Sequence, residues 1–302
     1  GARALAGGDH LGDVVADEVQ RRRVVGRIGR PHPAEQALVQ GRRLRDAGLI
    51  TPLLARELGD VLASHGLDAE AVRTYSEIVE FDPDNLGSRR LLGDIYLAHG
   101  WFEPACRQYR TLTEEAGDNP LFWLRLARAE AGAGRVDRAL RIERQVASAP
   151  GRPGPDDPRR WAKLWSAARL AQLLDEPPQG KDPGRMRESI QSRLKELQLF
   201  RGQGSLVVLT WRDPSADVLL ATLEGDTQVA AGEPTDAAST GLSAVLLAPG
   251  ERERVALRAI LRSPASKRPL QLARHDIHWD GKNFQVEVGE LTLPAGRTKM
   301  DL

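Results

Sequence analysis

The sequence predicts an α + β protein of two parts, an N-terminal α-solenoid of helical repeats followed by a C-terminal antiparallel β-sandwich. Two observations support this fold class. Residues recur at a fixed period of 34 through the first half of the chain, and after Phe200 the apolar spacing changes from helical to alternating. The chain has 302 residues, enough for two domains of ordinary size.

Small residues define the repeat. A glycine in the shared position between two helices can take the left-handed conformation that ends the first helix. An alanine at a second shared position lets paired helices approach closely. The recurring residues are Gly66, Gly100 and Gly134, then Ala71, Ala105 and Ala139, then Leu58, Leu92 and Leu126.

With this period and this pattern of small and large residues, the segment from about Pro52 to Pro150 resembles the tetratricopeptide repeat (TPR) family. The resemblance implies an α-solenoid with a concave face. We assign a degenerate or capping helical region to residues 1–50, three repeats to 51–150, and a linker with capping helices to 151–202. The flanking helices are expected at Asp13–Arg27, Ala34–Ala47, Arg159–Leu174 and Arg185–Phe200.

The concave face is expected to be lined by the fifth, ninth and twelfth positions of each repeat's first helix. Arginine there offers planar, multidentate hydrogen bonding and is favoured at binding hot spots. Asp60 and Asp94 at ninth positions would repel a peptide's terminal carboxylate, which disfavours a carboxylate clamp. Either arginine and aspartate pair with each other along the face, or they dock a mixed-charge peptide or domain. The candidate partner-binding residues are Arg56, Arg90, Asp94, Tyr96 and Arg128.

Residues 203–302 are predicted to form the β-sandwich. Turn signals such as Asp280-Gly281 separate short segments of alternating or apolar residues, a pattern typical of antiparallel sandwiches. The expected strands are Leu206–Trp211, Ala216–Leu223, Thr227–Ala231, Gly241–Leu247, Arg254–Leu261, Leu270–Trp279 and Asn283–Leu293.

The segments LVVLTWRDPSADVLLATLEG and FQVEVGELTLP resemble the start and end of the YfaP-like domain, a bacterial β-domain, over about Ser205–Pro294. In chains of that kind a VIT domain and a von Willebrand factor A domain often precede the helical region. The opening GARALAGGDH has neither an initiator Met nor a leader-like segment, and we expect it to be the cut end of such a longer chain. The resemblance favours a bacterial envelope or secreted setting, with the cytoplasm left open.

Two polar segments of the β-domain are candidates for cation sites. Asp213 and Asp217 supply few of the six to eight oxygens that calcium takes, so we expect a hairpin turn in which they cap backbone amides. Trp211 is then a core or edge aromatic. His275 and His278 are three residues apart, which on a strand places them on opposite faces, and we expect surface histidines without a metal.

Composition and motifs argue against several classes of function. The 43 basic and 42 acidic residues create no global field for nucleic acid, and the basic run Gln20–Arg30 is expected to be a solvated helix face. No apolar run approaches eighteen residues, so no membrane span is expected. Neither a Gly-x-Ser-x-Gly elbow nor a phosphate-binding or dinucleotide loop occurs. The sequence therefore predicts no enzyme, no cofactor and no metal.

The predicted function is non-enzymatic protein–protein scaffolding, in which the repeats dock a protein or peptide. In the alternative, the β-domain is an envelope or extracellular module that binds carbohydrate or a cation, and the repeats only present it. Exposed aromatics on one face of the sandwich, such as Trp211 with Trp279, would favour the alternative. A buried Trp211 would weaken it.

Overall fold

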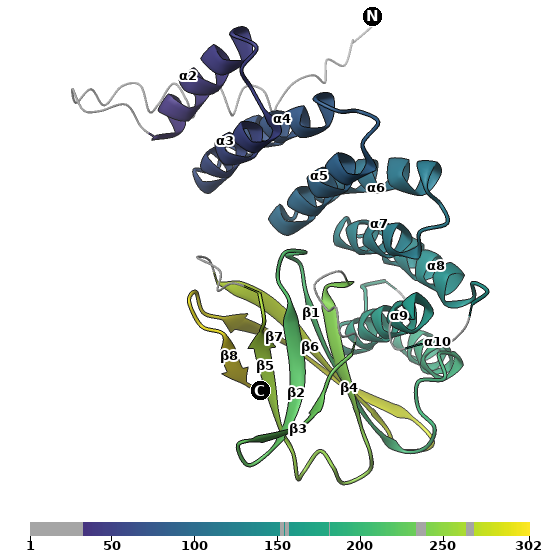
Figure 1. Ribbon diagram of the computed structural model, residues 1–302. Coiled ribbons are helices and arrows are strands. Elements are labelled where there is room, and N and C mark those ends of the chain that lie inside the picture. The colour runs from purple at the N-terminus through teal and green to yellow at the C-terminus, as the bar shows by residue number, and fades with distance from the viewer. Residues whose placement is uncertain (1–32, 152–153, 155–156, 181, 234–239, 264–268) are drawn as a thin grey trace, which may run out of the picture.

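The computed structural model describes residues 33–302 apart from 152–153, 155–156, 181, 234–239 and 264–268. A helical region precedes a β-domain built of two antiparallel sheets, which confirms the predicted α + β class. In Figure 1 the helices form a curved array that wraps one side of the β-domain. Of the helices in the described part of the chain, none has the length and hydropathy to cross a bilayer.

The helical region is a series of antiparallel helix pairs. Its first described helix is close to the expected Ala34–Ala47, whereas the expected helix at Asp13–Arg27 and the basic run Gln20–Arg30 lie outside the described residues. The helices are α2 (Pro33–Asp46), α3 (Pro52–Ser64), α4 (Asp68–Glu80), α5 (Leu86–His99), α6 (Phe102–Glu115), α7 (Pro120–Gly132), α8 (Val136–Ala147), α9 (Pro158–Asp175) and α10 (Pro183–Glu196).

The repeat glycines have the backbone conformation that their spacing predicts. Gly66, Gly100 and Gly134 have φ values of 73°, 77° and 80°, in the left-handed region where glycine carries no Cβ penalty. Each lies between the two helices of its repeat and ends the first one.

A second glycine position brings paired helices close together. A Cβ added to Gly59 would lie 2.5 Å from the ring of Tyr75, and one added to Gly93 would lie 2.9 Å from the ring of Tyr109. Both tyrosines are fully buried. The third repeat has alanine at the glycine position and Glu143 at the tyrosine position, so this packing pair is absent from it.

The β-domain contains two four-stranded antiparallel sheets, here called the first sheet (order β4-β1-β6-β7) and the second sheet (order β3-β2-β5-β8). The seven expected strands are present, and a short eighth strand was not predicted. The strands are β1 (Gly204–Trp211), β2 (Val218–Glu224), β3 (Thr227–Ala231), β4 (Leu242–Leu247), β5 (Ala256–Leu261), β6 (Leu270–Trp279), β7 (Phe284–Leu293) and β8 (Lys299–Asp301).

The first sheet is covered on both faces. One face packs on α9 and α10 in a core that includes Leu164, Leu206 and Ile277, and the other packs on the second sheet around Val207 and Leu220. All eight residues of β1 are buried as a result. This is why β1 reads as a continuous apolar run, since alternation marks strands with one solvated face.

The turn between β1 and β2 is partly as predicted. The Asp213 carboxylate accepts a hydrogen bond from the Ser215 amide at 2.8 Å, as expected of a capping aspartate. Asp217 instead pairs with Arg262 at 2.7 Å. Trp211 is buried and donates from Nε1 to the Ala216 carbonyl.

In the described residues, no group of three or more His, Cys, Asp or Glu side chains could hold a metal ion.

The expectation of surface histidines on β6 is wrong for His275. This side chain is 4% exposed, lies on the face of the first sheet that packs on the helices, and contacts the Thr210 hydroxyl at 3.2 Å. Burial, together with the charge of Arg169, lowers its pKa to about 4. The expectation failed because that face is covered by helices from a distant part of the chain. His278, on the other face, is partly buried beside Ser205.

Candidate functional site: the inner face of the repeats

Helices α3, α5 and α7 form the side of the repeat array that faces the β-domain, here called the inner face (Figure 1). The ninth position of each repeat lies on it and is occupied by Asp60, Asp94 and Arg128 in turn. The first two residues and the third have opposite charge, and the structure uses them differently.

In the first two repeats the aspartate accepts a hydrogen bond from the tyrosine of its own repeat. Asp60 accepts a hydrogen bond from the Tyr75 hydroxyl at 2.5 Å, and Asp94 accepts one from Tyr109 at 2.8 Å. Burial and the neighbouring Asp94 raise the pKa of Tyr109 well above its ordinary value, which keeps this hydroxyl a donor. Asp94 also pairs with Arg125 from the next repeat at 3.1 Å.

The fifth-position arginines of these two repeats remain accessible. Arg56 and Arg90 are both exposed, and Arg90 approaches Asp94 at 3.4 Å, four residues along the same helix. A pair with this exposure contributes little, of the order of 0.5 kcal/mol, and does not fix the guanidinium. Both guanidinium groups are therefore open to solvent.

Arg128 in the third repeat is buried against the β-domain. It is 5% exposed and donates from one terminal nitrogen to the carbonyl oxygens of Trp211 and Arg212, at 3.1 and 3.2 Å. Its guanidinium also lies 5.5 Å from the ring centre of Trp165 on α9. Burial lowers its pKa to about 10, at which it is still protonated at neutral pH. The ninth position of the third repeat thus binds the protein's own sandwich.

Further contacts join the helices to the β-domain around Arg128. The guanidinium of Arg212 stacks 5.2 Å over the Phe102 ring, and the Trp165 indole donates to the Thr240 carbonyl at 3.1 Å. Arg160, at the start of α9, pairs with Glu233. These contacts lie beside the apolar core shared by α9, α10 and the first sheet.

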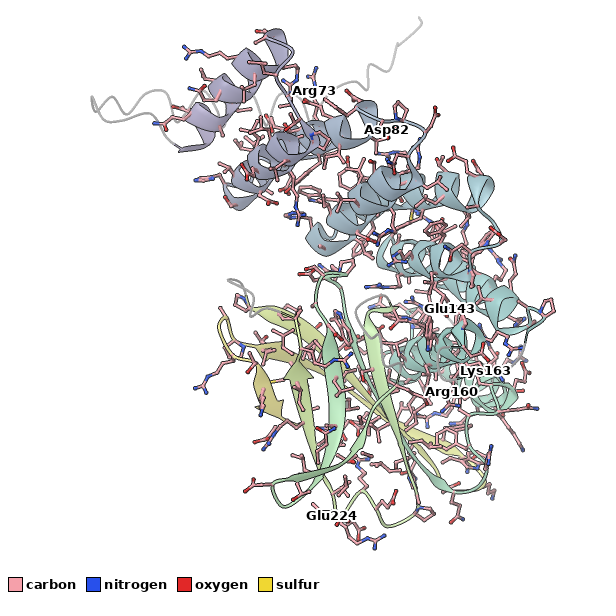
Figure 2. The ribbon with its side chains drawn as sticks, in the orientation of Figure 1. Arg73, Asp82, Glu143, Arg160, Lys163 and Glu224 are labelled. Atoms are coloured by element: carbon pink, nitrogen blue, oxygen red, sulfur yellow. The ribbon has the colours of Figure 1, made fainter. Side chains whose placement is uncertain are left out.

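Glu143, which replaces the repeat tyrosine, also connects the third repeat to the next helix, α9. It is fully buried between α8 and α9 (Figure 2) and accepts hydrogen bonds from Ser166 at 3.0 Å and from Arg169 at 2.6 Å. Burial raises the pKa of Glu143, and Arg169 opposes that rise. Arg128 and Glu143 thus both connect the third repeat to neighbouring elements.

The five residues predicted to bind a partner occupy three environments. Arg56 and Arg90 are exposed on the inner face; Asp94 is partly buried within a hydrogen-bonded cluster; Arg128 is under the sandwich. Tyr96 is in the repeat core, 2% exposed, with its hydroxyl donating to the Val72 carbonyl, and burial raises its pKa to about 12. It follows Asp94 by two residues, which turns it about 200° around α5, away from the inner face.

Sequence reasoning did not identify Arg125, Arg212 or Trp165, which complete these contacts. One signal was available, because Arg128 and Glu143 interrupt the aspartate and tyrosine that the first two repeats share. Departure from a repeat pattern marks the unit that contacts something other than another repeat.

Comparison with known proteins gives a match in the helical region. A tetratricopeptide repeat family model matches residues 90–158, within the segment predicted to form such repeats. Among solved structures, the chain is similar to one in "Structure of Naa15/Naa10 bound to HypK-THB", at 14% identity and a TM-score of 0.34, over 62% of this chain and 32% of that one. No curated protein matches. The YfaP-like resemblance of the β-domain stays a prediction.

Proposed function

We propose that the protein is a non-enzymatic interaction scaffold. The inner face of the first two repeats binds a protein or peptide segment, while the third repeat and α9 and α10 hold the β-sandwich in place. Arg56 and Arg90 supply charged hydrogen bonds to the partner. Arg128 belongs to the contact with the β-domain and is not proposed to bind the partner. Tyr96 is not proposed to bind it either, because it is buried in the repeat core.

One observation carries this proposal. The fifth-position arginines Arg56 and Arg90 are exposed in the first two repeats. In the third repeat the fifth position, Leu124, is buried against α9, and the ninth, Arg128, is covered by the chain's own sandwich. Tetratricopeptide arrays use their extended concave surfaces for binding, and only the uncovered part of this surface is accessible. The turn that carries Arg212 lies at the end of that part, against Phe102.

The alternative function has less support. A carbohydrate-binding face needs exposed aromatic rings, but Trp211 is buried in the β-domain core. Trp279 packs on Phe284, with ring centres 4.4 Å apart, and lies beside Lys195 of α10. Neither ring forms an open platform for a sugar.

The setting of the scaffold is proposed from the β-domain's resemblance to YfaP-like domains. That resemblance favours a bacterial envelope or secreted chain in which VIT and von Willebrand factor A domains precede the repeats. A partner recovered from envelope rather than cytoplasmic fractions would support this setting.

The experiment is affinity capture with quantitative mass spectrometry from lysate and envelope fractions of the organism that makes the protein. The test variant is Arg56→Glu/Arg90→Glu, which reverses charge on the inner face. The matched control is Arg73→Glu/Arg141→Glu, at exposed positions of the outer helices α4 and α8. Figure 2 labels Arg73 on α4.

The proposal expects proteins that the wild type and the outer-face control recover equally and that the inner-face variant loses. Circular dichroism and the melting temperature establish that both variants are folded. Partners retained at full yield by the inner-face variant would contradict the proposed site.

A further inference from the structure

The edge of the first sheet formed by β7 is long and open. Strand β7 has ten residues and pairs only with β6, so its other edge carries backbone groups that no strand of the described chain takes up. Such an edge is a ready template for another extended chain. It lies on the β-domain, apart from the inner face of the repeats.

The hydrogen bonding shows which residues face outward. Gln191 of α10 donates to the Phe284 carbonyl at 2.7 Å and accepts from the Phe284 amide at 2.6 Å, so both backbone groups of Phe284 point away from β6. The turn hydrogen bond from Asp280 to Asn283 gives the same alternation. Because β6 and β7 pair without a register shift, every second residue repeats this orientation.

Gln191 therefore blocks the first outward position, and four more lie beyond it along β7. Among the residues that the structure describes, the outward amides and carbonyls at these four positions have no backbone partner. Together they would pair with a strand of about seven residues, roughly 23 Å long. The four positions are Val286, Val288, Glu290 and Thr292.

The charge of β7 favours one kind of strand over another at this edge. Its sequence FQVEVGELTL has two glutamates, Glu287 and Glu290, and neither lysine nor arginine. Two copies paired through this edge would bring four glutamates together with no cation between them. A strand with basic side chains would be attracted to the same edge.

A cavity at the edge provides a place for one basic side chain. It has a volume of about 380 Å³. Its floor is the cross-strand row Ser205–His278–Gln285 and the neighbouring pair Asp276–Glu287 of the first sheet, both of which end on β7. The β4–β5 loop, including Arg252 and Glu253, forms the wall.

The carboxylates of this cavity are not equally available. Arg274 and Arg252 both pair with Asp276, at 2.6 and 3.1 Å. Glu253 and Glu287 line the same cavity, are exposed, and form no ion pair with the described residues. The cavity is therefore complementary to a cation.

The space beside Gly289, next to the cavity, favours a large side chain on the added strand. Gly289 follows Glu287 on the same face, and a Cβ placed there would have nothing within 4 Å. A glycine in an edge strand leaves space that a bulky cross-strand neighbour can fill. On the opposite face, Val286 and Val288 pack at the margin of the apolar core, which favours apolar side chains from an added strand.

We propose that the β7 edge binds an extended, basic segment of another protein by strand addition. The segment alternates apolar residues over Val286 and Val288 with basic residues, one of which enters the cavity beside Glu253 and Glu287. Main-chain hydrogen bonds supply affinity, and the cavity and the space at Gly289 supply selectivity.

The test measures fluorescence anisotropy of a labelled peptide, acetyl-TVRVYVKT-amide, with the whole chain. Its acidic twin, acetyl-TVEVYVET-amide, tests the charge requirement. The first variant is Val288→Pro, which removes an outward amide without breaking the ladder to β6. The second is Glu287→Lys, and the matched control is Glu224→Lys at the far end of the sandwich (Figure 2).

The basic peptide is expected to bind saturably, and the acidic twin about tenfold or more weaker. Val288→Pro should weaken the basic peptide by about tenfold, which corresponds to about 1.4 kcal/mol. Glu287→Lys should weaken it by roughly fivefold, and Glu224→Lys should leave it unchanged. Melting curves establish whether each variant is folded. If Val288→Pro does not fold, the Glu287→Lys result alone tests the proposal.

Three results would overturn the proposal. They are absence of saturable binding to the wild type, equal binding of the basic peptide by Glu287→Lys, and equal binding by a folded Val288→Pro. The other possible occupant of the edge is a second copy of the chain, and light scattering tests for it. A wild-type dimer that Val288→Pro abolishes would assign the edge to that second copy.

Discussion

The second and third repeats have the same helical arrangement and put it to different uses. In the second, Asp94 accepts from Tyr109 of the same repeat and Arg90 is exposed. In the third, Arg128 donates to the β-domain, and Glu143 accepts from α9. Arg128 and Glu143, two of the third repeat's departures from the pattern of the first two, thus contact the β-domain and α9 respectively.

This difference shows that the inner face of this array is not uniformly accessible. Its last unit is occupied by the sandwich, which shares an apolar core with α9 and α10. The fifth-position arginines of the first two repeats are thus exposed, whereas the third repeat contacts the β-domain.

The substitution expected to have the largest effect on this difference between repeats is Arg128→Asp. It gives the third repeat the ninth-position residue of the other two. A carboxylate would face the carbonyls of Trp211 and Arg212, and we expect a loss of about 4 kcal/mol. Urea unfolding followed by circular dichroism should show a lower midpoint and a separate transition of the β-domain. The control Arg90→Asp, at an exposed site, should change stability by less than about 0.5 kcal/mol. A wild-type midpoint for Arg128→Asp would contradict this account of the contact.

The contact between helices and sandwich should also depend on pH. His275 is neutral when folded because its pKa is lowered to about 4, whereas in the unfolded chain it takes up a proton near its ordinary value of 6.5. Stability is therefore full above about pH 6.5 and is lost as the pH falls towards 4, by up to roughly 3 kcal/mol. His275→Gln should remove that part of the acid sensitivity in urea titrations at pH 7 and 4.5. An unchanged pH dependence would contradict the burial of a neutral imidazole.

A smaller effect on stability is expected at the repeat position that Gly59, Gly93 and Ala127 share. Gly59→Ala places a Cβ against the ring of Tyr75, and we expect a loss of about 2 kcal/mol after the gain in helix propensity. The third repeat already has Ala127 there, with no tyrosine to contact, and Ala127→Gly should cost about 1 kcal/mol. Melting temperatures measure both changes. A more stable Gly59→Ala would show that the close approach does not require glycine.

The repeats were predictable because their cause is local. Gly66, Gly100 and Gly134 end helices by their own conformational freedom, and Ala71 and its equivalents are buried whatever lies beyond the array. Strands were also predictable from alternation and turns, apart from β8, whose three residues KMD carry no such pattern.

The site was less predictable because it depends on which surfaces meet. The departure at the ninth position marks Arg128 as unusual, but only the placement of the β-domain against it shows that Arg128 is covered while Arg90 stays exposed. His275 has a polar strand neighbourhood in sequence, and its burial comes from α9, about a hundred residues earlier. Periodicity within an element gives its faces but not the distant element that covers each face.

The division of the inner face is tested most directly by cysteine labelling. Arg90→Cys and Arg128→Cys are treated separately with a maleimide, and the native Cys106, which is buried, gives the background rate. The account predicts that the cysteine at position 90 reacts at the rate of an unfolded chain and that the one at position 128 reacts about a hundredfold more slowly until urea is added. Equal rates at the two positions in native buffer would contradict it.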